Sequence, residues 1–163
     1  MNLLDDFKSR GLFHQSTDED ALRKALDGGV VTGYIGFDPT AASLHAGHLL
    51  QILNLVRLQR AGHRPIAIVG GGTGLIGDPS GKQQERTLLT REVLDGYLQG
   101  IRAQLGRYLD FDASPNGALM VDNAEWLGAL HLLEFLRDVG KHFSVNAMVQ
   151  RDSVKKRLEE REQ

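Results

Sequence analysis

Hydrophobic positions in the first half of the chain follow two spacings that predict strands alternating with a helix. Residues 30–37 (VVTGYIGF) and 64–71 (RPIAIVGG) are short runs of β-branched and other apolar residues beside glycines, which is typical of buried strands. Between the two runs, apolar side chains recur at the spacing of one helical face, at Leu49, Ile52, Leu53 and Val56. This helical pattern ends at Gly62.

The rest of the chain contains three further patterned segments. Ser16 and Glu19 form a capping-box pattern before a helix that is expected to stop at Gly28 and Gly29. Thr90 is expected to cap a helix that runs to about Leu109, with an inner face made of Leu94, Leu98, Ile101 and Leu105. Residues 117–123 (GALMVDN) follow as a third strand, and the remaining residues are predicted to be helical with a charged end.

The order of these elements predicts the fold class. A strand, a helix of this length and a second strand form a parallel unit. We therefore predict one α/β domain over residues 1–163, with a Rossmann-like open parallel sheet and flanking helices. Ligands bind such sheets beyond the carboxyl ends of the strands, and polar clusters follow the predicted strands at residues 34–48, 71–86 and 122–126. These clusters are expected to converge on one cleft.

Composition narrows the functional classes only modestly. The chain has 163 residues, with 19 basic and 21 acidic side chains and a formal net charge of -2, so no global basic field indicates nucleic acid as a partner. The absence of cysteine excludes disulfides and thiolate metal sites. The N-terminus lacks the pattern of a signal peptide, and no apolar run has the length of a membrane span. We expect a cytoplasmic protein without a membrane partner.

His45 and His48 begin the first predicted crossover helix, and three interpretations are open from the residues alone. They are either ordinary polar residues of a first helical turn, a zinc pair, or part of an anion site. Zinc would need a third ligand and usually an i, i+4 spacing, so no bound metal is predicted. A helix N-terminus attracts phosphate, and Gly47 between the histidines would let a nucleotide approach the backbone. This pattern favours phosphoryl or nucleotidyl chemistry.

The glycine cluster after the second predicted strand resembles two nucleotide-binding motifs without satisfying either. Gly72, Gly74 and Gly77 fit G-x-G-x-x-G, but that fingerprint opens directly into a helix, whereas the chain is expected to break again around Asp78. A Walker A loop fails because Gln83 follows Lys82. NAD binding is therefore not predicted. The cluster is interpreted as a glycine-lined wall near Asp78, followed by a cationic loop with Lys82 and Arg86.

Three stretches carry a resemblance to a known family. YIGFDPTAASLHAGH, GGGTGLIGDPSGK and VGKHFSVNAM strongly resemble bacterial tyrosyl-tRNA synthetases, which are class I aminoacyl-tRNA synthetases. Residues 45–48 (HAGH) resemble the HIGH motif, with Ala46 in place of isoleucine, and Gly72 stands where alanine is common. The family continues well beyond position 163, so the chain resembles an N-terminal fragment, the first half of the catalytic domain. The anticodon-binding domain and the KMSKS-type loop are not in it.

The resemblance implies that tyrosine is activated by ATP, with Mg2+, and is then transferred to tRNA(Tyr). Catalytic roles are implied for Thr40 and His45 toward the terminal phosphate, for His48 toward the nucleotide, and for Lys82 and Arg86 toward the leaving pyrophosphate. Substrate-binding roles are implied for Tyr34, Gly36, Asp38, Gly47, Asp78 and Asn123. Tyr34 and Asp78 would hold the phenol group, and Asn123 would lie at the rim of the cleft.

Two alternatives remain open at this stage. One is a small nucleotidyltransferase of the phosphopantetheine adenylyltransferase type, which also uses an H-x-G-H helix start. The other is a catalytically inactive nucleotide-binding fragment. The fragment alone is expected to have very low activity, and a homodimer is expected for the full-length protein. The resemblance places the helices after about Leu127 near that dimer interface, which would leave Leu133, Phe135 and Val145 partly exposed in a monomer.

Overall fold

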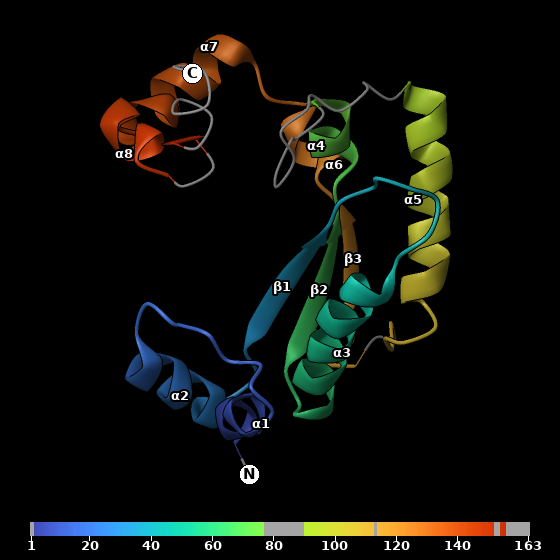
Figure 1. The fold of residues 1–163 in the computed structure, drawn as a ribbon, viewed down its shortest axis with the longest axis vertical. Helices are drawn as coiled ribbons and strands as arrows, with labels where there is room; N and C mark the ends of the chain where they lie inside the picture. The colour runs from blue at the N-terminus through green and yellow to red at the C-terminus, as the bar shows by residue number, and fades with distance from the viewer. Residues whose placement is uncertain (1, 77–89, 113, 152–153, 156–163) are drawn as a thin grey trace.

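The computed structural model describes residues 2–76, 90–112, 114–151 and 154–155. Within them the chain forms a parallel sheet with helices around it (Figure 1). The elements of the first half are α1 (Leu3–Ser9), α2 (Glu19–Gly28), β1 (Thr32–Phe37), α3 (Ala46–Arg60), β2 (Arg64–Val69) and α4 (Gly71–Ile76). Those of the second half are α5 (Arg91–Leu105), β3 (Leu119–Asp122), α6 (Ala124–Leu127), α7 (Leu132–Asp138), η1 (Gly140–His142) and α8 (Val145–Val149).

The three strands form one sheet in the order β1-β2-β3, and both neighbouring pairs are parallel. The register pairs Tyr34 with Ile66 and Phe37 with Val69, which in turn lies beside Asp122 of β3. All three strands therefore end at the same edge. The predicted parallel α/β sheet is confirmed, because both strand pairs are parallel and each pair is joined by a crossover that contains a helix.

The hydrophobic core lies between one face of the sheet and helices α3 and α5. It is built from buried residues of both layers, which include Phe37, Ile52, Leu55, Ala67 and Val69. The predicted inner face of α5 is confirmed, since Leu94, Leu98, Ile101 and Leu105 are all buried. The opposite face of the sheet is more open, and Tyr34 on β1 and Leu119 on β3 keep 71% and 44% of their surface exposed.

Helix ends agree with the sequence in one case and differ in others. Thr90 caps α5 as predicted by accepting a hydrogen bond from the N–H of Val93, but the helix ends at Leu105 rather than near Leu109. The predicted cap of α2 at Ser16 is wrong, because Asp18 accepts the hydrogen bond from the N–H of Ala21. Ser16 instead donates its hydroxyl to the carbonyl of Asp18. A carboxylate is an equally good cap and lies one residue before the helix.

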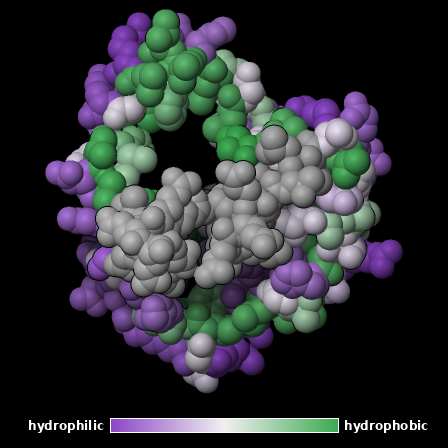
Figure 2. Space-filling model, turned by 45° about the horizontal axis from the view of Figure 1, so that its top comes forward, coloured by the Kyte–Doolittle hydropathy of each residue, from purple (hydrophilic) through white to green (hydrophobic). Residues whose placement is uncertain are grey.

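The segment from α7 to α8 extends away from the sheet as an arm of short helices (Figure 1). Its large apolar side chains are exposed, including Leu132, Leu133, Phe143 and Val145. Hydrophobic residues also form continuous patches on the face displayed in Figure 2. Within the described residues, no helix is long and apolar enough to cross a membrane.

Candidate functional site at the carboxyl edge of the sheet

The two histidines cap the N-terminus of α3 by exchanging hydrogen bonds with the backbone. His45 is the N-cap residue, and its Nδ1 accepts a hydrogen bond from the N–H of Gly47 at 3.1 Å. The Nδ1 of His48 accepts one from the N–H of His45 at 3.2 Å. A ring nitrogen that accepts a hydrogen bond carries no proton, so both imidazoles hold their proton on Nε2 when neutral. Each ring therefore keeps one N–H donor for a ligand.

The environment of His48 favours this neutral form. The two imidazoles are stacked with their centroids 3.8 Å apart and their planes at 29°. Burial lowers the pKa of His48, and the neighbouring His45 lowers it further, whereas the carboxylate of Asp38 acts in the opposite direction. Phe37, the last residue of β1, lies 6.3 Å from the His48 ring, so the pair is located where the strand ends.

The absence of a side chain at Gly47 is required by the packing of the His45 ring. A Cβ atom at this position would lie 3.0 Å from Cε1 and 3.1 Å from Nδ1 of His45, which is tighter than an ordinary contact. A side chain at position 47 would therefore displace the His45 ring or break its cap. That Gly47 also leaves room for a nucleotide stays a prediction.

The loop that carries Thr40 into the histidine pair rests on α5. Figure 1 shows this loop running from the end of β1 across α5 before α3 begins. The N–H of Leu44 donates to the side-chain oxygen of Gln104 at 2.9 Å. A Cβ on Gly100 would lie only 2.2 Å from the carbonyl oxygen of Ala42, so the backbone of the loop touches the helix. The side chain of Gln104 and the absence of one at Gly100 thus position the loop.

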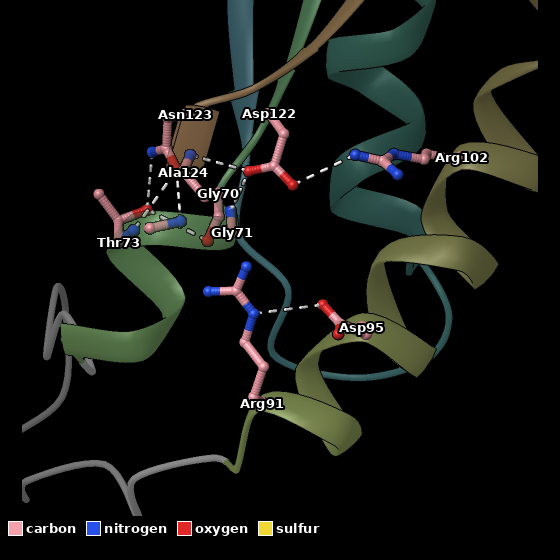
Figure 3. Close-up of polar contacts among 10 residues, drawn as sticks. Gly70, Gly71, Thr73, Arg91, Asp95, Arg102, Asp122, Asn123 and Ala124 are labelled. Atoms are coloured by element: carbon pink, nitrogen blue, oxygen red, sulfur yellow. Dashed lines mark hydrogen bonds and ion pairs between the residues drawn. The ribbon is translucent and has the colours of Figure 1, made fainter. Parts of the chain in front are cut away.

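The glycine cluster after β2 is itself helical, because Gly72 and Gly74 lie within α4. The chain break expected around Asp78 lies outside the described residues. The N-terminus of α4 is filled by side chains from the end of β3 (Figure 3). Asp122 accepts a hydrogen bond from the N–H of Gly71 at 3.1 Å, and the amide oxygen of Asn123 accepts one from Gly72 at 2.7 Å. Dinucleotide folds need those N–H groups for pyrophosphate. Because Asp122 and Asn123 already occupy these N–H groups, the N-terminus of α4 does not support NAD binding.

Gly70, Gly71, Gly72 and Gly74 of the cluster are surrounded by protein atoms rather than forming an open wall. A Cβ on Gly71 would lie 2.2 Å from Oδ1 of Asp122, and one on Gly74 would lie 2.9 Å from Pro39. A Cβ on Gly70 would lie 2.7 Å from the hydroxyl of Thr73. The glycines therefore let α4 pack closely against β3 and the loop after β1.

Asp122 and Arg102 were not identified from the sequence, although they organise this edge of the sheet. Asp122 also accepts a hydrogen bond from the N–H of Ala124 at 2.9 Å, and Arg102 of α5 donates to its other oxygen at 3.2 Å (Figure 3). Asn123 is buried and donates to the hydroxyl of Thr73 at 3.1 Å. The sequence feature that could have identified Asp122 is a carboxylate at the end of an apolar strand, next to the predicted site residue Asn123.

The structure brings only some of the predicted site residues together. Gly47 and the two histidines are in contact, and Asp38 is close enough to His48 to influence its pKa. Thr40 is exposed on the connecting loop, and Tyr34 and Gly36 are exposed along β1. Asp78, Lys82 and Arg86 lie outside the described residues. Asn123 lies at the end of β3, where its amide holds α4.

Chemically, the edge offers hydrogen-bond donors to an anion rather than ligands to a metal. Among the described residues, no group of three histidine or carboxylate side chains is arranged to hold a metal ion. The N-terminus of α3 carries a partial positive charge, and the histidine pair adds two Nε2–H donors beside it. This combination suits a phosphate group.

The parallel sheet and the histidine pair at its edge are features of class I aminoacyl-tRNA synthetases, and comparison with known proteins identifies the family. Residues 27–163 match the family described as tRNA synthetases class I (W and Y), and the chain belongs to this family. The tyrosine–tRNA ligase of Streptococcus pneumoniae (strain Hungary19A-6) is 55% identical to it over 159 residues, which are 98% of this chain and 38% of that protein. The chain thus spans less than half the length of this relative.

Solved structures of tyrosyl-tRNA synthetases share the fold. The C-terminally truncated mitochondrial enzyme of Aspergillus nidulans matches with a TM-score of 0.84 and 28% identity, covering 98% of this chain and 48% of that one. The corresponding enzyme of Coccidioides posadasii matches with a TM-score of 0.82 and 27% identity, covering 98% and 46%. These matches set aside the small phosphopantetheine-type nucleotidyltransferase.

Proposed function

We propose that the full-length protein containing this chain is a tyrosine–tRNA ligase. It activates tyrosine with ATP to form tyrosyl-adenylate and pyrophosphate, and then transfers the tyrosyl group to tRNA(Tyr). The observation that carries the proposal is the reciprocal capping of α3 by His45 and His48, which leaves the Nε2–H group of each ring as a donor at the carboxyl edge of the sheet. The 55% identity to a named tyrosine–tRNA ligase supports the choice of tyrosine.

The proposed first step needs no covalent enzyme intermediate. A carboxylate oxygen of tyrosine forms a bond to the α-phosphorus of ATP, and the bond from that phosphorus to the bridging oxygen breaks. Pyrophosphate leaves with the bonding electrons. Negative charge therefore accumulates on the departing phosphates, where donors that are already oriented stabilise the transition state more than the bound substrate.

Residue roles follow the family pattern. Thr40 and His45 would donate to the terminal phosphate, and His48 would face the nucleotide. Lys82 and Arg86 would neutralise the leaving pyrophosphate. ATP would arrive with Mg2+ bound to its own phosphates, as is usual for Mg2+ at nucleotide sites.

Recognition of tyrosine would use the strand end nearest the histidines. Gly36 follows Tyr34 along β1, and Asp38 is the first residue after the strand, on the way to the proposed ATP site. The phenol hydroxyl would be held by Tyr34 together with Asp78, and Asp38 and the backbone of Gly36 would face the amino acid and the ribose. Asn123 would contribute by holding α4, the helix that precedes Asp78 in the chain.

Amino-acid-dependent exchange of pyrophosphate into ATP tests the activity of the full-length protein. Tyrosine should support exchange, whereas phenylalanine and tryptophan should support far less, because a site that hydrogen-bonds a phenol leaves polar groups unpaired with either competitor. Exchange with tryptophan as the best substrate would overturn the proposal. Residues 1–163 alone should exchange at a rate lower by several orders of magnitude, because several transition-state donors worth about 2 to 4 kcal/mol each would be missing.

A further inference from the structure

A second candidate site lies at the other end of α3, in a groove between this helix and α1. The groove has a volume of about 380 Å³, within the range of small-ligand pockets. Its apolar lining includes Leu3 of α1 with Leu53 and Val56 of α3. Such a lining accommodates the apolar body of a small molecule.

The rim of the groove carries three guanidinium groups and one carboxylate. One carboxylate oxygen of Asp6 accepts a hydrogen bond from Nε of Arg10 at 2.7 Å. The other oxygen lies 3.5 Å from Nε of Arg57. The guanidinium of Arg57 also donates to the carbonyl of Leu53 at 3.3 Å, and its side chain is only 27% exposed. Asp6 therefore holds two arginines in place and neutralises only one of their charges.

Arg60 is the third cation of the rim, one helical turn after Arg57. No hydrogen bond or ion pair of Arg60 occurs within the part of the chain that the structure describes. It lines both the groove and an adjoining cavity of about 430 Å³, which it shares with Val56 and Tyr108. A guanidinium between two hollows, beside a half-neutralised arginine pair, is available to an anion.

This groove is separate from the carboxyl edge of the sheet. His45 and Arg57 are twelve residues apart on α3, which corresponds to about 18 Å along a helix. A purely structural role is the alternative, in which Arg57 and Arg60 only complement the negative end of the α3 dipole. That alternative explains their charge, but it does not explain why they border a groove that is also lined by Leu53 and Val56.

We propose that the groove between α1 and α3 binds a small phosphorylated ligand that has an apolar or aromatic body. The phosphate would lie among Arg10, Arg57 and Arg60, and the apolar body would lie on Leu53 and Val56. The volume of about 380 Å³ is that of a small-molecule pocket, which favours a small molecule over a polymer. The proposal does not depend on the tyrosine-activating function.

Benzyl phosphate is a suitable probe, titrated into the full-length protein with methyl NMR as the readout. We expect saturable shifts of the Leu3, Leu53 and Val56 methyl groups, while Leu49 near the histidine pair stays unshifted. Arg60→Gln should weaken this binding about tenfold, because a charge-assisted hydrogen bond is lost. Arg107→Gln is the matched control, since Arg107 is an exposed arginine that lines neither hollow, and it should leave the affinity unchanged.

Benzyl alcohol and inorganic phosphate separate the two parts of the ligand. Benzyl alcohol should produce no saturable shift, and inorganic phosphate should bind more weakly than benzyl phosphate. Equal binding of inorganic phosphate would overturn the role of the apolar lining. An unchanged affinity in Arg60→Gln, or no saturable shift up to about 10 mM, would overturn the site. Shifts caused only by an RNA oligonucleotide would overturn it in favour of a nucleic-acid surface.

Discussion

At the scale of single residues, the chemistry of the edge depends on which ring nitrogen of each histidine faces the backbone. Because both Nδ1 atoms accept backbone hydrogen bonds, both Nε2 atoms remain donors. The sequence predicted the position of the pair at a helix start. It did not predict the mutual capping, because the capping depends on ring orientation and on the close approach permitted by Gly47.

Replacing His45 by asparagine should separate capping from catalysis. Asparagine is a good N-cap, so the free energy of unfolding should change by less than about 1 kcal/mol. The Nε2 donor is lost, and the rate of tyrosyl-adenylate formation should fall about 10²- to 10³-fold while tyrosine affinity changes little. Chemical denaturation and single-turnover kinetics of the full-length protein measure both quantities. Loss of stability with an unchanged chemical step would reduce His45 to a helix cap.

The lowered pKa of His48 makes stability depend on pH with a defined sign. The unfolded chain binds a proton at His48 with a pKa near 6.5, and the folded protein binds it only at lower pH. The contribution of His48 is therefore complete above about pH 6.5 and declines as the pH falls through the folded pKa. Urea unfolding at a series of pH values should show this decline, and His48→Gln should flatten it. An equal slope in the variant would contradict the assignment.

At the scale of elements, the periodic segments were predictable and the glycine-rich helix was not. Strands and long helices can be predicted from sequence because their apolar residues repeat at a fixed spacing, as the buried leucines of α5 do. Helix α4 contains three glycines in six residues, which disfavours a helix locally. It forms where Asp122 and Asn123, about fifty residues later, cap its N-terminus. Local propensity cannot anticipate such a distant contact.

Two glycines of α5 provide a matched test of how the loop after β1 is positioned. A Cβ on Gly96 meets nothing within 4 Å, so Gly96→Ala should stabilise the protein by about 0.5 to 1 kcal/mol. Gly100→Ala would bring a methyl group to 2.2 Å from Ala42, which should destabilise it by about 1 to 3 kcal/mol. Because the displaced loop carries Thr40, adenylate formation should also slow only in Gly100→Ala. Thermal unfolding measures the stability of each variant, and single-turnover kinetics measure its rate of adenylate formation. Equal stabilities and equal rates in the two variants would contradict the contact between Gly100 and Ala42.

At the scale of the whole molecule, the arm from α7 to α8 exposes apolar side chains that water disfavours. Leu133, Val145 and Phe135 keep 80%, 72% and 37% of their surface exposed, which confirms the predicted exposure. Exposed apolar patches of this kind mark association sites. We infer that this arm contributes to a homodimer of the full-length protein.

Leu133→Asp should weaken that dimer at least about tenfold, because it places a charge in an apolar contact. Glu134→Gln on the same helix is the control and should leave association nearly unchanged. Sedimentation equilibrium of the full-length variants over a range of concentrations gives the dissociation constants. Equal constants for Leu133→Asp and the unsubstituted protein would show that the arm is covered by something other than a second copy.

Charging of tRNA is the measurement that tests the central claim most directly. The full-length protein, supplied with ATP and Mg2+, should attach tyrosine to tRNA(Tyr) and should attach neither tryptophan nor phenylalanine at a comparable rate. The expected selectivity follows from a pocket that holds the phenol hydroxyl by hydrogen bonds, which the competitors cannot replace. Attachment of tryptophan to tRNA(Trp) in preference, or the absence of any charging by a folded full-length protein, would contradict the account.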